Sequence, residues 1–145
     1  MTDDGYTLRL ETPGSDEYRR LRAVAGLAVR SRKAADAGLP NTIAGVVVRT
    51  GDGVAVAMGR AVGDGLNYEV VDVAVDPAHQ GRGLGKQVMA ALMEQLRAIA
   101  PAEAYVSLIA DGEAHRLYAQ FGFEPTAPAS IGMAQWIGRD EAEAN

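Results

Sequence analysis

The chain of 145 residues has the length of one ordinary domain and contains no cysteine. Without cysteine, disulfides, thiolate metal ligands and a cysteine nucleophile are excluded. The net charge of -5 and the pI near 5.0 argue against a nucleic-acid partner. No apolar run approaches the roughly 18 residues that cross a membrane, and the acidic first residues are unlike a secretory signal, so we expect a cytoplasmic protein with no membrane partner.

The first forty residues predict one strand and two helices. Alternating apolar residues favour a strand over Tyr6–Leu10. Ser15 is expected to cap the first helix, because acidic residues follow it in the first turn. Gly26 should interrupt the helical pattern before a second helix that ends near Ala37.

Three β-rich runs follow, over residues 43–50, 53–62 and 66–75, with a Gly-Asp-Gly turn signal in each gap. Short runs separated by such turns are typical of an antiparallel meander. We therefore expect the centre of a sheet here.

The second half predicts further helices and strands in alternation. Apolar residues recur at helical spacing from Leu84 to about Ala100, before Pro101. A strand over 104–109 is followed by a short helix within 111–123, with Asp111 as a candidate cap and Gly122 at its end. Residues 130–138 are expected to form a last strand.

This order of elements predicts a mixed α/β (α+β) fold around a largely antiparallel sheet. We expect residues 1–139 to form one domain and the acidic residues 140–145 to be a disordered tail.

Three glycines, Gly81, Gly83 and Gly85, lie between the third β-rich run and the long helix. A glycine turn at a helix start exposes backbone N–H groups that hold anions. The dinucleotide fingerprint fails here because Lys86 stands in place of its last glycine. The P-loop pattern fails as well, because it needs a glycine where Gln80 stands and Ser or Thr after Lys86.

The segment QGRGLG, Gln80–Gly85, resembles the Q/R-x-x-G-x-G/A signature of the GNAT superfamily of acyl-CoA-dependent N-acetyltransferases. The segments DVAVDPAHQ and EAHRLYAQFGFEP resemble that superfamily's next most typical segments, and together the three cover Glu69–Pro125. The resemblance implies a mostly antiparallel sheet of six to seven strands, flanked by about four helices and splayed between the fourth and fifth strands.

The resemblance also implies acetyl-CoA as the acyl donor, with no metal. The pantetheine arm would pair with the backbone of the strand at Val73 and Val75, and the Val75 N–H would also face the thioester carbonyl. Asp111 stands where relatives commonly carry asparagine, so a cofactor contact made through the asparagine amide is not implied for this chain. The residues implied to bind the donor are Val73, Ala74, Val75, Gln80, Gly81, Arg82, Gly83, Leu84, Gly85, Lys86, Asp111, Ala114 and Tyr118.

Three residues are candidates for catalysis under the resemblance. Tyr118 matches the tyrosine that protonates the leaving thiolate in many relatives. Glu69 matches a glutamate that acts as a base through water, and Asp72 matches an aspartate of the amino-sugar branch. Strict strand alternation predicts that Glu69 and Asp72 point to opposite faces, with Asp72 beside Tyr68 and Val70.

The implied function is transfer of an acetyl group to a primary amine of a small molecule: an arylalkylamine, a polyamine or an amino sugar. Acetylation of a protein N-terminus or lysine, and a non-catalytic acyl-CoA sensor, are the alternatives. Acidic residues such as Asp64 favour a cationic acceptor, whereas Arg30, Arg32 and Lys33 favour a phosphorylated one. Relatives frequently form dimers through C-terminal strands, so the resemblance also implies a homodimer.

Overall fold

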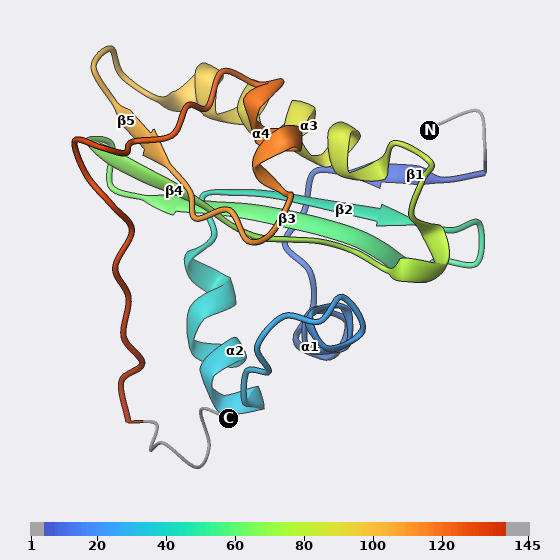
Figure 1. Ribbon diagram of the computed structural model, residues 1–145. Coiled ribbons are helices and arrows are strands. Elements are labelled where there is room, and N and C mark those ends of the chain that lie inside the picture. The colour runs from blue at the N-terminus through green and yellow to red at the C-terminus, as the bar shows by residue number, and fades with distance from the viewer. Residues whose placement is uncertain (1–4, 139–145) are drawn as a thin grey trace.

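The structure is a computed structural model that describes residues 5–138. A twisted sheet separates two helical layers (Figure 1). The strands are β1 (Thr7–Arg9), β2 (Ala44–Arg49), β3 (Ala55–Gly63), β4 (Asn67–Val75) and β5 (Tyr105–Ser107). They lie side by side in chain order. The first four strands pair antiparallel and β5 pairs parallel to β4, which confirms the predicted meander and fold class.

Four helices flank the sheet, as predicted. Helices α1 (Ser15–Val24) and α2 (Arg32–Gly38) cover one face, and α3 (Leu84–Ile99) and α4 (His115–Ala119) cover the other (Figure 1). Helix α3 buries one apolar stripe, which includes Val88, Leu92 and Leu96, against the sheet. A second, smaller core joins α1 and α2 to the opposite face. The sheet therefore has a buried centre on both sides.

Two helix starts differ from the predicted caps. Gly14 is the N-cap of α1, and its N–H donates to Glu17 Oε2 at 2.9 Å, while the Ser15 hydroxyl donates to Asp36. Asp111 does not cap α4, because the helix begins later, after Ala114. The Asp111 backbone carbonyl instead accepts the Ala114 N–H at 3.0 Å in the preceding turn.

The sheet opens between β4 and β5, as predicted. Only Asn67, Tyr68 and Glu69 of β4 pair with β5, so the rest of β4 has no strand beside it on that side within residues 5–138. The open stretch of β4 ends at Val75, shortly before the glycine turn and α3. The splay thus leaves backbone hydrogen-bonding groups available next to a helix start.

The predicted strand over 130–138 was wrong, and the described sheet has five strands instead of six or seven. The segment has no neighbouring strand in the part of the chain that the structure describes, and an extended segment needs such a partner to become a strand. Its large apolar side chains are exposed, among them Ile131, Met133 and Ile137. The predicted tail 140–145 lies outside the described residues. Among residues 5–138, no helix is long and apolar enough to cross a membrane.

Candidate active site

The three glycines of the turn, Gly81, Gly83 and Gly85, are required for two different structural reasons. Gly81 and Gly83 adopt φ of +79° and +76°, a conformation that side chains with a Cβ rarely adopt. Gly85 instead lies against its neighbours, since a Cβ there would be 3.3 Å from Leu117 Cδ2 and 3.8 Å from Val75 Cγ2. Gly83 caps α3 without a side-chain hydrogen bond from the described residues. The first N–H groups of α3 are therefore free to bind an anion.

The open edge of β4 supplies a second row of donors. The Asp76 N–H donates to Val56 O on the neighbouring β3 at 2.8 Å. Because successive N–H groups along a strand point to opposite sides, the Val75 and Val73 N–H groups point away from β3, into the splay. An extended ligand lying in the splay would meet both.

The turn and the open edge form the walls of one cleft of about 420 Å³. It contains all the residues predicted to bind the acyl donor except Arg82 and Asp111. Its remaining walls come from the α1–α2 connection, through Ala25 and Leu27, and from Leu117 of α4. The lining residues that were predicted are Val73, Ala74, Val75, Gln80, Gly81, Gly83, Leu84, Gly85, Lys86, Ala114 and Tyr118.

The two exceptions lie elsewhere. The Arg82 guanidinium donates to the Tyr6 hydroxyl at 2.8 Å and stacks over that ring, so it faces the start of β1. Asp111 lines a larger adjoining cavity of about 930 Å³. Ala114 and Tyr118 line both cavities, so the two cavities meet there. Asp111 lines only the larger cavity and not the cleft beside the glycine turn.

Tyr118 lies at that meeting point and is 9% exposed. Its ring contacts Phe123 edge-on, with centroids 6.5 Å apart, which holds the side chain in place. Burial raises the pKa of the phenol above its ordinary value of 10.0, and the charge of Asp111 raises it further. The hydroxyl is therefore protonated at neutral pH and can only donate its proton.

Asp72 lies at a bulge in β4. Met58 pairs with Ala74 and Arg60 pairs with Val71, so Asp72 and Val73 together lie opposite Gly59 of β3. Asp72 itself adopts φ of +57°. The extra residue turns the Asp72 side chain toward α1 and α2, into the same cavity as Val71. The prediction that it shares a face with Tyr68 and Val70, opposite Glu69, was wrong because strict alternation stops at the bulge.

The Asp72 carboxylate is the centre of a buried polar cluster. Its Oδ1 pairs with Arg22 Nη1 at 2.5 Å and accepts the Tyr18 hydroxyl at 3.1 Å, while Oδ2 pairs with Arg60 Nε at 2.7 Å. The Asp72 side chain is 5% exposed. Burial raises the pKa of Tyr18, and the Asp72 charge adds to the rise, so Tyr18 remains a donor. Loss of the Asp72 charge by substitution would weaken two ion pairs at once.

Sequence reasoning missed Tyr18, Arg22 and Arg60. One signal was present, because Tyr18, Leu21 and Arg22 share a helix face and an arginine is unusual on the apolar side of a helix. Arg60 likewise interrupts an otherwise apolar strand. Neither pattern identifies Asp72 as the partner, since that depends on the bulge.

Glu69 is exposed and lies at the end of β4 that pairs with β5. Its cross-strand partner on β3 is Val62, which lines the same cavity as Asp72, so Glu69 belongs to that face of the sheet. Along the strand it lies about 13 Å from Val73, at about 3.3 Å per residue. Glu69 is absent from the described cavities that contain Tyr118. Any role as a base there requires bridging water.

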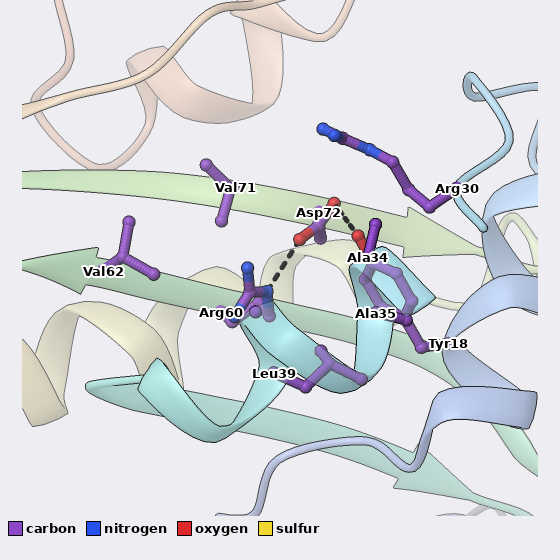
Figure 2. A pocket seen from close by; sticks show the side chains of 10 residues that line it. Tyr18, Arg30, Ala34, Ala35, Leu39, Arg60, Val62, Val71 and Asp72 are labelled. Atoms are coloured by element: carbon purple, nitrogen blue, oxygen red, sulfur yellow. Dashed lines mark hydrogen bonds and ion pairs between the residues drawn. The ribbon is translucent and has the colours of Figure 1, made fainter. Parts of the chain in front are cut away.

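A narrower cavity of about 180 Å³ extends from the adjoining one under α2 (Figure 2). The two share Arg30, Val71 and Asp72. The rest of its lining comes from Tyr18, Ala34, Ala35, Gly38, Leu39, Arg60 and Val62. Of the predicted cationic residues, Arg30 alone lies here, while Lys33 is exposed and Arg32 pairs with Asp16 on the surface. Three connected cavities thus run from the glycine turn past Tyr118 to Arg30.

No group of three or more His, Asp or Glu within residues 5–138 is placed to hold a metal.

Comparison with known proteins gives one consistent result. The family model described as "Acetyltransferase (GNAT) domain" matches residues 42–125. A solved structure of a probable acetyltransferase from meticillin-resistant Staphylococcus aureus superposes with a TM-score of 0.86 at 36% identity, covering 90% of this chain and 98% of that chain. Glucosamine-6-phosphate N-acetyltransferase from Arabidopsis thaliana superposes with a TM-score of 0.68 at 18% identity, covering 90% of this chain and 99% of that one. That second likeness concerns the fold alone.

A curated relative is similar over part of the chain. Serotonin N-acetyltransferase 2, chloroplastic, from Oryza sativa subsp. japonica is 37% identical over 89 residues, which are 61% of this chain and 44% of that protein. The chain therefore spans less than half the length of this curated relative.

Proposed function

The chain belongs to the GNAT family of acetyltransferases, and on this premise we propose that it transfers the acetyl group of acetyl-CoA to a primary amine of a small molecule. One observation carries the proposal. The donor cleft and the wider cavity meet at Tyr118 and at the open edge of β4, so a thioester and an amine entering from opposite sides would meet beside a proton donor. Direct attack in a ternary complex fits this geometry, because the chain has no cysteine to carry the acetyl group.

The donor would bind along the cleft by backbone contacts. The N–H groups of the glycine turn and the start of α3 would hold the pyrophosphate, and Lys86 would add a positive charge. The Val73 and Val75 N–H groups would pair with the pantetheine arm, and one of them would stabilise the negative charge that develops on the thioester oxygen.

In the transfer step the amine nitrogen attacks the thioester carbon and the carbon–sulfur bond breaks. The sulfur leaves as thiolate and takes a proton from Tyr118, while the attacking nitrogen loses its extra proton, which restores the Tyr118 phenol through water. With a thiol pKa near 8.5 and a phenol pKa above 10, this donation is uphill by at least about 2 kcal/mol. Tyr118 therefore assists the departure of the thiolate and is not indispensable to it.

The amine must first lose a proton, because an alkylamine with a pKa of about 10 is mostly cationic at neutral pH. We propose Glu69 as the base, acting through water, since its carboxylate is exposed and has no ion pair among the described residues. Asp72 is the second candidate, but its oxygens already accept hydrogen bonds from three side chains.

Replacing Glu69 by glutamine is expected to lower kcat about 100-fold at pH 7, the usual range for losing a general base. The loss should shrink toward pH 9.5, because the free amine fraction rises about tenfold per pH unit below its pKa. Steady-state rates across this pH range would measure the rescue. Asp52→Asn, at an exposed turn, is the matched control and should behave as the unaltered chain. An equal deficit at every pH would contradict a role for Glu69 as the base.

The proposed activity is tested by following thiol release from acetyl-CoA with a panel of arylalkylamines, polyamines and amino sugars. Amine-dependent release supports the proposal. Release with peptides alone would favour the protein-acetylating alternative. Tight acetyl-CoA binding by calorimetry without thioester loss on any acceptor would favour the acyl-CoA sensor.

We further propose a homodimer, a single domain over residues 1–139 and a cytoplasmic location. The exposed apolar side chains of Ile131, Met133 and Ile137 support the dimer, because a partner subunit would cover them. Sedimentation equilibrium would then report twice 15.2 kDa, whereas a monomer mass would refute it. Limited proteolysis tests the domain limits, and fractionation of the source cells tests the location.

A further inference from the structure

The cavity under α2 contains more positive than negative charge. The guanidinium groups of Arg22, Arg30 and Arg60 lie in or beside it, and Asp72 is the carboxylate that faces them. Arg22 and Arg60 share Asp72 as their partner. Two positive charges therefore remain after Asp72 is counted, although the whole chain carries a net charge of -5.

Arg30 has no carboxylate partner within residues 5–138. Its Nε is buried and makes no hydrogen bond there. Its guanidinium carbon lies 4.6 Å from the centre of the Trp136 ring, which orients the group without balancing its charge. Figure 2 shows the guanidinium reaching over β4, beside Asp72 and Val71. A buried polar atom without a partner costs free energy, and a ligand that accepts its hydrogen bond removes that cost.

The walls of the cavity fit a small charged group better than a long cation. Val62, Val71 and Leu39 line it beside the guanidinium groups. Its volume of about 180 Å³ equals roughly six water molecules at about 30 Å³ each. The nearby acidic residues do not make the net charge of the cavity negative. Glu69 is exposed, and the Asp64 carboxylate is exposed and accepts the Leu66 and Asn67 N–H groups of its own turn. Water and salt screen the charge of an exposed carboxylate much more than the charge of a buried guanidinium, so the positive charge dominates inside the cavity.

The position of the cavity relates it to the reaction. It opens into the wider cavity that reaches Tyr118, through the shared Asp72, Val71 and Arg30. An acceptor with its amine near Tyr118 would extend its other end toward Arg30. That end of the acceptor would lie beside the guanidinium of Arg30, whose positive charge has no carboxylate partner within residues 5–138.

Resting on the proposed acetyl transfer, we propose that the acceptor is a primary amine that also carries an oxyanion, a carboxylate or a phosphate, and that Arg30, assisted by Arg60, binds this group. A guanidinium presents paired N–H donors that match either oxyanion. The anion would neutralise the guanidinium charge of Arg30. Polyamines and arylalkylamines without an acidic group are then poor acceptors.

The first experiment compares amines that differ only in the acidic group. The pairs are glucosamine 6-phosphate with glucosamine, phenylalanine with phenethylamine, and ornithine with putrescine, each tested by thiol release from acetyl-CoA. In at least one pair the anionic member should have a kcat/KM about 10- to 100-fold higher, the worth of a charged hydrogen bond. The phosphate and carboxylate pairs separate the two kinds of anion. Equal or better use of the neutral member in every pair overturns the inference.

Variants locate the effect at Arg30. Arg30→Met should remove the preference through KM for the anionic amine and leave KM for acetyl-CoA unchanged. Lys33→Gln, which removes an exposed charge close by in the chain, is the matched control and should keep the preference. If Arg30→Met does not fold, Arg30→Lys retains the charge without the paired donors and should keep only part of the preference. A preference that Arg30 variants leave intact refutes the assignment.

A second experiment is independent of turnover. Trp136 is the only tryptophan in the chain and stacks on Arg30, so its fluorescence should respond when an anion binds there. Glucose 6-phosphate and 3-phenylpropionate are the probes, with glucose and 3-phenylpropanol as neutral counterparts. A saturable change with an anionic probe, absent in Arg30→Met, supports the site even if no amine is acetylated. Turnover of neutral amines without any such change leaves the acetyl transfer standing and overturns the anion site.

Discussion

Replacing Asp72 by asparagine is expected to lower the free energy of unfolding by about 3 kcal/mol, the lower part of the range for breaking a buried ion pair. The change leaves Arg22 and Arg60 buried at the α1 face without their common counter-charge. Tyr18 also loses a charged acceptor. Urea denaturation, compared at equal m-value, measures the loss.

Asp36→Asn is the matched control, because Asp36 is exposed and accepts from the Ser15 hydroxyl at the surface. Its effect should stay within about 0.5 kcal/mol. A drop below 1 kcal/mol for Asp72→Asn would show that the cluster contributes little to stability. The activity of the folded fraction supplies a second readout. A kcat reduced about 100-fold in fully folded protein would make Asp72 the base instead of Glu69.

Replacing Tyr118 by phenylalanine is expected to lower kcat about 100-fold while KM for acetyl-CoA changes little. The ring packs against Phe123 in either variant, so only the proton donor is lost. Because burial and the charge of Asp111 raise the pKa of Tyr118, loss of the phenol proton should lower the rate only at a higher pH than an ordinary tyrosine would require. Stopped-flow measurement of thiol release at saturating donor separates this step from binding.

Tyr105→Phe provides the control, since that side chain is 57% exposed on β5 and lies away from the cleft. Its rate should match that of the unaltered chain. If Tyr118→Phe also retains the full rate, the thiolate leaves without help from Tyr118, and the residue serves only to pack α4 against the sheet.

The cleft beside the glycine turn was predictable from the sequence because local patterns determine it. A glycine turn between an apolar strand and an amphipathic helix restricts the backbone through φ and close packing, and these depend on neighbours in the chain. The cleft lined by Val75, Gly83 and Lys86 follows from that arrangement. The meander and α3 were predicted for the same reason, since their periodicity is local.

The cavity under α2 was not predictable in the same way. The bulge at Asp72 has no periodic signal, and it is what joins β4 to Arg22 and Arg60 from two other elements. The position of Arg30 over the sheet depends on the path of the α1–α2 connection. The error over residues 130–138 has a different cause, because β propensity predicts where a strand can form and says nothing about whether a partner strand is beside it.

The bulge also has a consequence for anyone who redesigns this protein by counting along β4. Upstream of it, the even-numbered residues Tyr68 and Val70 face α3, whereas downstream the odd-numbered Val73 and Val75 do. The strand is thus two half-strands out of phase by one residue. A substitution scheme that assumes one phase would mutate the core where it intends to mutate the acceptor cavity. Each half can therefore be altered separately: the first to change the cavity under α2, and the second to change the cleft beside the glycine turn.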